Sequence, residues 1–120
     1  MKIAITTSGN SLDSALDQRF GRAAAFLIYD LEQQSFTVID NQQNLSAAQG
    51  AGIQAAETIA NQEVDALLTG HCGPKAFRVL QAAGIKVYNT DAKTVQEALD
   101  LFRQNKLKEA SGADVDGHWS

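Results

Sequence analysis

The chain has 120 residues, a formal net charge of −4, 44% hydrophobic residues and one cysteine. This composition is that of a single globular domain, which at this length buries about two-thirds of its unfolded surface without a disulfide or a metal. The acidic balance argues against nucleic-acid partners, no apolar run approaches the roughly 20 residues of a membrane span, and a lone cysteine excludes an internal disulfide, so we expect a cytoplasmic protein.

The first half of the chain predicts three strands. Lys2–Thr7 alternates apolar and polar residues and indicates a strand, and a polar, glycine-bearing segment follows over Ser8–Arg22. Two more apolar runs, Ala25–Tyr29 and Phe36–Ile39, are typical of strands. Because only the short polar stretch Glu32–Ser35 separates them, we expect them to form a hairpin.

The middle of the chain alternates helices and strands. After a polar loop over Asn41–Gln49, helical spacing of apolar residues predicts a helix over Gly52–Gln62. The apolar run Val64–Thr69 predicts a buried strand. A helix over Pro74–Ala83 follows, with proline at its first position and a glycine just past its end, and then a strand over Ile85–Tyr88.

A last helix is predicted after Thr94, which forms a capping box with Glu97 before a further apolar stripe. The residues from Asn105 onward show no clear period. We therefore expect one α/β domain over residues 1–107 and a C-terminal tail over residues 108–120.

The element order β-β-β-α-β-α-β-α predicts the fold class. The two strands after helical crossovers should run parallel to each other and to the first strand, giving a mixed five-stranded sheet flanked by helices. The polar segments should then meet at the carboxyl edge of the first strand, while the plain hairpin turn lies at the opposite edge. The segments expected to converge are Thr7–Asn10, Arg19–Arg22, Asn41–Gln49, Gly70–Lys75 and Asn89–Lys93.

The segment His71-Cys72-Gly73-Pro74-Lys75 is the most informative one in the chain. It lies between a predicted buried strand and a predicted helix, which is where open α/β sheets bind ligands. A thiol, an imidazole, a cation and the free N–H groups of a helix end therefore fall within a few residues. This combination favours an anionic ligand with affinity for sulfur.

Each of these side chains also has a structural interpretation. Cys72 could simply fill space at a strand end, and as a nucleophile it would lack a base, because the neighbouring His71 side chain should diverge from it. His71 could be a hydrogen-bonded turn residue, and His118 a solvated residue of the tail. One cysteine and two histidines fall short of a zinc or iron–sulfur site, so a bound metal cluster must bring most of its own ligands.

The cations and glycines allow alternatives as well. Arg19, Arg22 and Lys75 could surround an anion or be ordinary surface charges. The pattern starting at Gly50-Ala51-Gly52 weakly matches a dinucleotide-binding motif, but a helix start with close backbone approach explains both glycines. A ribonuclease-H-type nuclease is improbable, because Lys2–Thr7 contains none of the acids that such a site needs on its first strand.

Four motifs occur in order: Asp17–Ala23, Gly50–Gly52, Gly70–Phe77 and Gly84–Tyr88. Together they resemble the dinitrogenase iron–molybdenum cofactor biosynthesis family, over residues 1–107. The resemblance implies a ribonuclease-H-like fold without nuclease activity, and a carrier or accessory protein that binds a preformed metal–sulfur cluster rather than an enzyme. The chain is a small stand-alone form, so a molybdenum–copper sulfide is as compatible as an iron–molybdenum cluster, and a role in nitrogen fixation is not implied.

We therefore expect an anionic metal–sulfur cluster to be held non-covalently at the carboxyl edge, with cluster donor and acceptor proteins as partners. A nucleotide- or phosphate-binding module at this edge and a Cys72-dependent enzyme are the alternatives. Arg19, Arg22, Lys75 and Cys72 should lie around one pocket, and Cys72 should be at least partly accessible to solvent. Cys72 and His71 are the expected metal contacts, and the other expected binding residues are Ser8, Arg19, Phe20, Gly21, Arg22, Gly50, Gly52, Gly70, Gly73 and Lys75.

Overall fold

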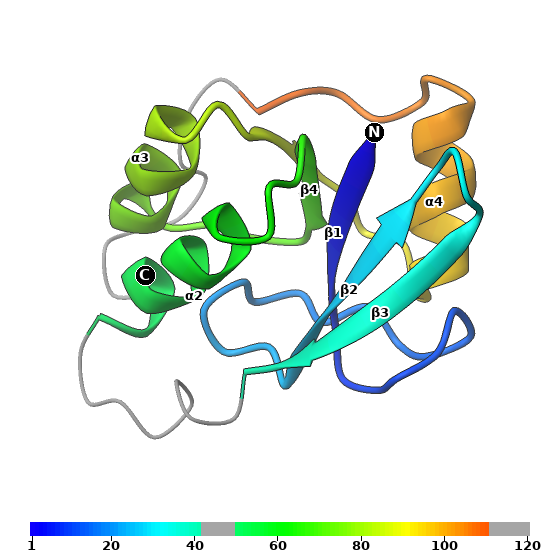
Figure 1. Cartoon of the computed structure of the whole chain (residues 1–120), viewed down its shortest axis with the longest axis horizontal. Helices are drawn as coiled ribbons and strands as arrows, with labels where there is room; N and C mark the ends of the chain where they lie inside the picture. Colours follow the sequence, from blue (N-terminus) through cyan, green and yellow to red (C-terminus); the bar gives the residue numbers. More distant parts are fainter. Residues whose placement is uncertain (42–49, 111–120) are drawn as a thin grey trace.

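The computed structural model describes residues 1–41 and 50–110 and contains the predicted sequence of elements (Figure 1). The elements take up nearly the residues that the apolar pattern indicates, in the order β-β-β-α-β-α-β-α. They are strands β1 (Lys2–Thr7), β2 (Ala25–Asp30), β3 (Ser35–Asp40), β4 (Ala66–Thr69) and β5 (Lys86–Asn89), and helices α2 (Ala51–Ala60), α3 (Pro74–Ala82) and α4 (Val95–Arg103).

The five strands form one mixed sheet in the order β3-β2-β1-β4-β5. β1 pairs antiparallel with β2, from Lys2 opposite Asp30 to Thr7 opposite Ala25, and β2 pairs antiparallel with β3. On its other side β1 pairs parallel with β4, which pairs parallel with β5. The predicted mixed α/β fold is confirmed. The carboxyl ends of β1, β4 and β5 therefore lie at one edge of the sheet.

Helices cover both faces of the sheet, with α2 and α3 on one face and α4 on the other (Figure 1). The alternation in β1 supplies both layers: Ala4 packs with Phe20 and Leu80 toward α2 and α3, whereas Ile3 and Ile5 belong to the cluster that includes α4. Because side chains alternate across a strand, one strand contributes to two hydrophobic cores.

The helix ends follow the signals in the sequence. Pro74 occupies the first turn of α3, and Gly84, just past its end, has a φ of 78°. The Thr94 hydroxyl accepts a hydrogen bond from the backbone N–H of Glu97, as a capping box requires. The Glu97 carboxylate accepts in return from the N–H of Lys93, one residue earlier than the usual partner.

Most boundaries lie within one residue of the sequence prediction, and two differ from it by two residues. α2 ends at Ala60 and β4 begins at Ala66, so the connection between them is longer than expected, with Glu63 at a φ of 58°. Val64 is nevertheless buried in the core, and the N–H of Asp65 donates to the carbonyl of Lys2. Val64 is apolar because it packs, although it lies outside the strand.

The β2–β3 hairpin turn lies at the opposite edge from the carboxyl ends of β1, β4 and β5. The carboxylate of Asp30 accepts hydrogen bonds from the backbone N–H groups of Glu32 and Gln33, at 2.9 and 3.1 Å. The hydrogen bond from Gln33 has the largest effect on the pKa of Asp30. Together with the bond from Glu32 it lowers this pKa below its ordinary value of 3.8. The bonds hold a tight turn without the Asn-Gly pair that the shortest hairpins favour.

The first residues of the predicted tail lie along β5. Glu109 forms an antiparallel bridge with Tyr88, and the N–H of Ala110 donates to the carbonyl of Val87 at 2.7 Å. The segment after α4 therefore returns across the carboxyl edge before the described part of the chain ends. His118 lies outside the described residues. No helix in residues 1–41 and 50–110 is long and apolar enough to cross a membrane.

Candidate functional site

The end of β1 is tied to the segment that follows it. The N–H of Asp17 donates to the carbonyl of Thr6, and the N–H of Ser8 donates to that of Ala15. The buried hydroxyl of Thr6 lies 2.7 Å from the carbonyl oxygen of Asp17 and 2.9 Å from the hydroxyl of Thr69 in β4. Two buried threonines thus join the ends of β1 and β4 to the polar segment.

Residues 18–20 pair with the turn that follows β4. The N–H of His71 donates to the carbonyl of Gln18 at 2.7 Å, and the N–H of Phe20 donates to the carbonyl of His71 at 3.1 Å. Gly70 is required by this approach, because a Cβ atom there would lie 2.8 Å from the Cα of Gln18. The Arg19 backbone is therefore placed directly beside His71.

The other two glycine motifs also meet. A Cβ atom on Gly21 would lie 2.8 Å from the Cα of Gly52, so the Arg19–Arg22 turn packs on the first turn of α2. Gly50 precedes that helix with a φ of 77°. The glycines at these positions permit close backbone contact and a left-handed turn, which other residues would strain.

The segment after β5 completes the edge. The side-chain amide of Asn89 donates to the carbonyl of Gly70 at 3.0 Å, and the N–H of Thr90 donates to the carbonyl of Thr69 at 2.9 Å. The predicted convergence of segments at the carboxyl edge is confirmed for the described residues. Asn41 is buried and donates to the carbonyl of Ala23, but residues 42–49 of the predicted loop lie outside the described part.

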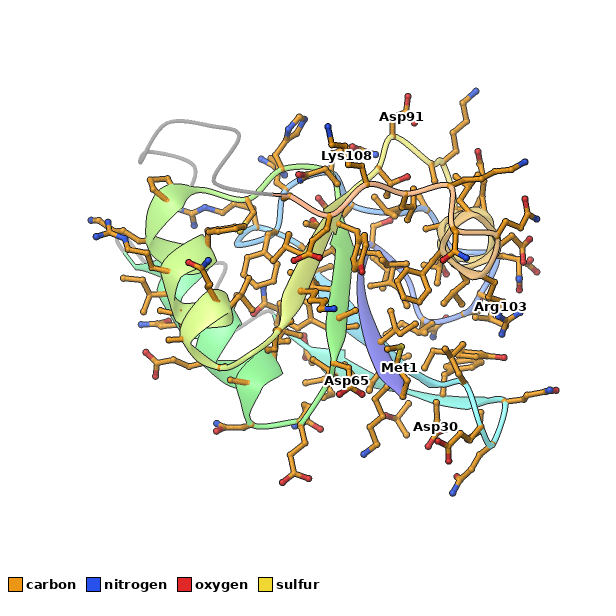
Figure 2. The ribbon with its side chains drawn as sticks, turned by 90° about the horizontal axis from the view of Figure 1, so that it is seen from above. Met1, Asp30, Asp65, Asp91, Arg103 and Lys108 are labelled. Carbon is orange, nitrogen blue, oxygen red and sulfur yellow. The ribbon has the colours of Figure 1, made fainter. Side chains whose placement is uncertain are left out.

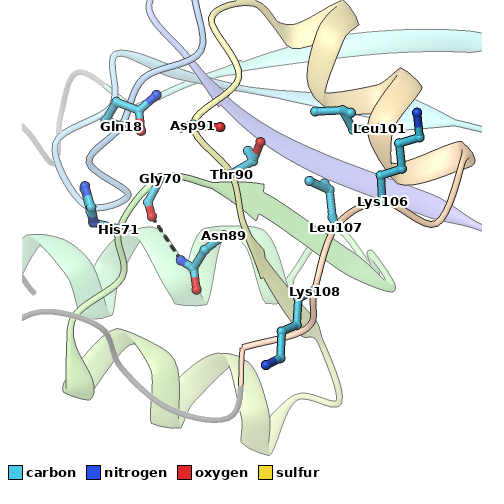
Figure 3. A pocket seen from close by; sticks show the side chains of 10 residues that line it. All are labelled: Gln18, Gly70, His71, Asn89, Thr90, Asp91, Leu101, Lys106, Leu107 and Lys108. Carbon is cyan, nitrogen blue, oxygen red and sulfur yellow. Dashed lines mark hydrogen bonds between the residues drawn. The ribbon is translucent and has the colours of Figure 1, made fainter.

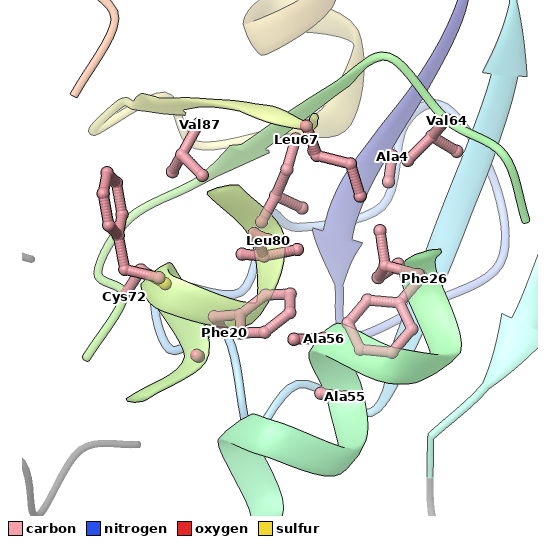
Figure 4. Packing of buried hydrophobic residues seen from close by; sticks show 14 of the residues in the cluster. Ala4, Phe20, Phe26, Ala55, Ala56, Val64, Leu67, Cys72, Leu80 and Val87 are labelled. Carbon is pink, nitrogen blue, oxygen red and sulfur yellow. The ribbon is translucent and has the colours of Figure 1, made fainter. Parts of the chain in front are cut away.

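Cys72 does not reach this polar surface. Only 2% of it is exposed, and it belongs to the cluster that includes Phe20, Phe77 and Val87 (Figure 4). The expectation of an accessible thiol is wrong. His71 turns toward solvent, so its neighbour Cys72 faces the core, where the aromatic and aliphatic side chains accept a small polarisable sulfur. A thiol in this position is not presented to a substrate, which removes the basis for a Cys72-dependent enzyme.

Phe20 is also a core residue. It is 2% exposed, and its ring centroid lies 5.7 Å from that of Phe26. Phe20 therefore anchors the Arg19–Arg22 turn to the hydrophobic core. Among the other expected site residues, Arg19, Lys75 and Ser8 are exposed and Arg22 is half-buried. Gly73 directly precedes α3, and its carbonyl accepts a hydrogen bond from the N–H of Phe77.

A pocket of about 540 Å³ opens at the carboxyl edge (Figure 3). Of the expected site residues, it is lined by Gly70 and His71. Arg19, Arg22, Cys72 and Lys75 do not line this pocket. The expectation that those four residues surround one pocket stays a prediction. The full lining is Gln18, Gly70, His71, Asn89, Thr90, Asp91, Leu101, Lys106, Leu107 and Lys108.

Sequence analysis missed the lysines of this lining. Lys106 and Lys108 are on the segment that showed no periodicity, and it is the pairing of Glu109 and Ala110 with β5 that brings this segment to the pocket. The alternation Lys106-Leu107-Lys108 is the only local signal, because it suggests an extended segment with one apolar face.

The pocket is at one end of the molecule. Viewed along the direction of Figure 2, Asp91 and Lys108 lie at one edge, and Asp30, Asp65 and Met1 lie toward the other. Within residues 1–41 and 50–110, no three His, Cys, Asp or Glu side chains gather in a group able to hold a metal ion. In this part of the chain the edge offers cations, backbone N–H groups and amides rather than a set of metal ligands.

Comparison with known proteins identifies the relatives of this chain. Residues 1–105 match the dinitrogenase iron–molybdenum cofactor family. The chain belongs to that family. The predicted resemblance is thereby confirmed, and the four glycine-bearing motifs on which it was based include the turns that meet at the carboxyl edge.

Several relatives align with this protein over at least 90% of each of the two chains compared. The apo form of the orange protein from Desulfovibrio gigas is 41% identical, with 95% of this chain and 96% of that chain covered and a TM-score of 0.92. A NifB-like protein from Thermotoga is 37% identical, covering 90% and 91%, with a TM-score of 0.80. An uncharacterised protein of Methanocaldococcus jannaschii is 32% identical over 90% of each chain.

Proposed function

We propose that the protein binds and carries an anionic metal–sulfur cluster at the carboxyl edge of its sheet. The observation that carries the proposal is the meeting of the motifs around Gly21, Gly52 and Gly70 at this edge, in a chain that matches the cofactor family over residues 1–105. The described donor set supports a preassembled cluster, because backbone N–H groups and cations can hold an anion without replacing its own ligands.

In this proposal the chain contributes charge and hydrogen bonds. Arg19, Arg22 and Lys75 neutralise the cluster, and the glycine turns allow the backbone to approach its sulfides closely. His71 is the exposed member of the expected pair of metal contacts and can ligate or donate a hydrogen bond. Cys72 would have to leave the core to ligate, so its main contribution is packing.

The role is that of a carrier rather than a catalyst. The orange protein has been described in an apo form, and the Thermotoga relative is described as a putative NifB protein. The family description, which names the dinitrogenase iron–molybdenum cofactor, supports a metallocluster as cargo, of the iron–molybdenum or the molybdenum–copper sulfide type, passed between donor and acceptor proteins. A non-covalent site suits this role, because the cargo must also be released.

Anaerobic reconstitution tests the proposal. The purified protein is mixed with tetrathiomolybdate and a copper or iron salt, separated from small molecules by gel filtration, and analysed for metal, sulfide and visible absorption. We expect molybdenum and sulfide to elute with the folded protein and to give a visible band. Protein that elutes without metal under every combination would contradict the proposal.

A further inference from the structure

The pocket at the carboxyl edge has two walls from distant parts of the chain (Figure 3). One wall is the turn after β4, with Gly70 and His71, and it is held in place by backbone hydrogen bonds of His71 with Gln18 and Phe20. The other wall is the segment of Lys106, Leu107 and Lys108, which follows α4. The space between them is bounded by Asn89 and Thr90, at the end of β5.

Hydrogen bonds hold the backbone and the Asn89 side chain of this pocket in place. Asn89 is fixed by its bond to the carbonyl of Gly70, and Thr90 is held by its bond to the carbonyl of Thr69. The second wall is attached to the sheet through Glu109 and Ala110, which pair with β5. A ligand in the pocket would therefore contact groups that are positioned before it arrives, which lowers the entropic cost of binding.

The charge of the pocket favours an anion. Lys106 and Lys108 are both exposed, and neither forms an ion pair within the described part of the chain. The one carboxylate among the lining residues is that of Asp91, whose side chain points outward from the edge in Figure 2. The lining thus carries two ammonium groups and one carboxylate, and in Figure 3 the side chains of Lys106 and Lys108 point in different directions.

The pocket also has an apolar part. Leu101 and Leu107 line it, and in Figure 3 Leu107 points toward Thr90, with the two lysines before and after it along the segment. A volume of about 540 Å³ lies in the usual range of small-ligand sites, and the two leucines add apolar contacts to a lining that is otherwise mostly polar. A sulfide-covered anion is larger and more weakly hydrated than an oxyanion, so it gains more from the leucine contacts.

We infer that this pocket is where the cluster sits, with Lys106 and Lys108 supplying its main charge compensation and Leu101 and Leu107 contacting its sulfides. The inference rests on the proposed function and moves the centre of the site away from Arg19, Arg22 and Lys75, toward the segment after α4. His71 is shared by both arrangements, because it borders the pocket and the Arg19 turn.

Two double variants separate the arrangements, and a third is the matched control. Lys106→Gln with Lys108→Gln removes the pocket cations, and Arg19→Gln with Arg22→Gln removes the turn cations. Lys2→Gln with Lys86→Gln makes the same charge change at the amino ends of β1 and β5. All are reconstituted with the metal and sulfide mixture that loads the wild type, and molybdenum retained per protein is measured after gel filtration at several salt concentrations. Thermal unfolding confirms that each variant is folded.

We expect the Lys106/Lys108 variant to bind the cluster at least about tenfold more weakly and with a smaller salt dependence than the Lys2/Lys86 control, which should bind like the wild type. Either of two results would show that the cluster does not bind in this pocket, although the proposed function would stand. In the first, the Lys106/Lys108 variant binds the cluster as well as the control does. In the second, the Arg19/Arg22 variant retains clearly less molybdenum than the Lys106/Lys108 variant. A folded wild type that retains no metal would overturn the proposed function, and this inference with it.

Discussion

At the scale of single residues, burial decides which side chains can act. His71 and Cys72 are neighbours in the sequence, yet His71 is exposed and Cys72 is buried with Phe20 and Phe77. The sequence could show that the turn contains both, but not which of the two faces the core. That choice depends on the backbone bonds from His71 to Gln18 and Phe20, which are long-range contacts.

The first prediction concerns the Cys72 thiol. Because the thiol is 2% exposed, an alkylating reagent should modify native protein at least about a hundredfold more slowly than protein in denaturant, since reaction requires local opening. The measurement is the rate of mass increase at both conditions. Cys72→Ala should still retain metal after reconstitution. Rapid alkylation of the folded protein, or complete loss of metal in Cys72→Ala, would show that the thiol is at the site.

At the scale of elements, local signals predicted most of the fold. Pro74 and Gly84 mark the start and the end of α3, and the capping residue Thr94 marks the start of α4. Each of these residue types meets a specific need of a helix end. Strand boundaries were less predictable. Val64 continues the apolar run before β4 because it is buried, and burial alone does not distinguish a strand from a packed loop.

The contact between the Arg19–Arg22 turn and α2 leads to a second prediction. Gly21→Ala places a methyl group 2.8 Å from the Cα of Gly52, which is backbone and cannot move aside cheaply. We expect the free energy of unfolding to fall by about 1–3 kcal/mol, as for other overpacked sites. Equilibrium urea unfolding measures it.

The control for this variant is Gly50→Asn. Gly50 has a φ of 77° but nothing within 4 Å of its Cβ position, and asparagine tolerates that conformation. This variant should lose clearly less stability than Gly21→Ala. Equal losses in both variants would mean that backbone conformation, rather than the close contact with α2, explains the glycines.

At the scale of the whole molecule, the sheet topology determines which edge carries the candidate site, and long-range pairing adds the second wall of its pocket. Parallel pairing of β1, β4 and β5 brings their carboxyl ends to one edge, which could be predicted from the element order alone. The second wall of the pocket could not, because residues 106–108 have no helical or strand period. They reach the edge only because Glu109 and Ala110 pair with β5.

An amide chemical-shift comparison of the apo and reconstituted protein tests the carboxyl-edge site most directly. With the cluster bound, signals should shift or broaden in Gly70–His71, Asn89–Asp91 and Lys106–Lys108. Signals of the β2–β3 turn around Asp30 and of Asp65 at the opposite edge should keep their positions. Changes centred on Asp30 and Asp65, with the three carboxyl-edge segments unaffected, would contradict a cluster site at this edge.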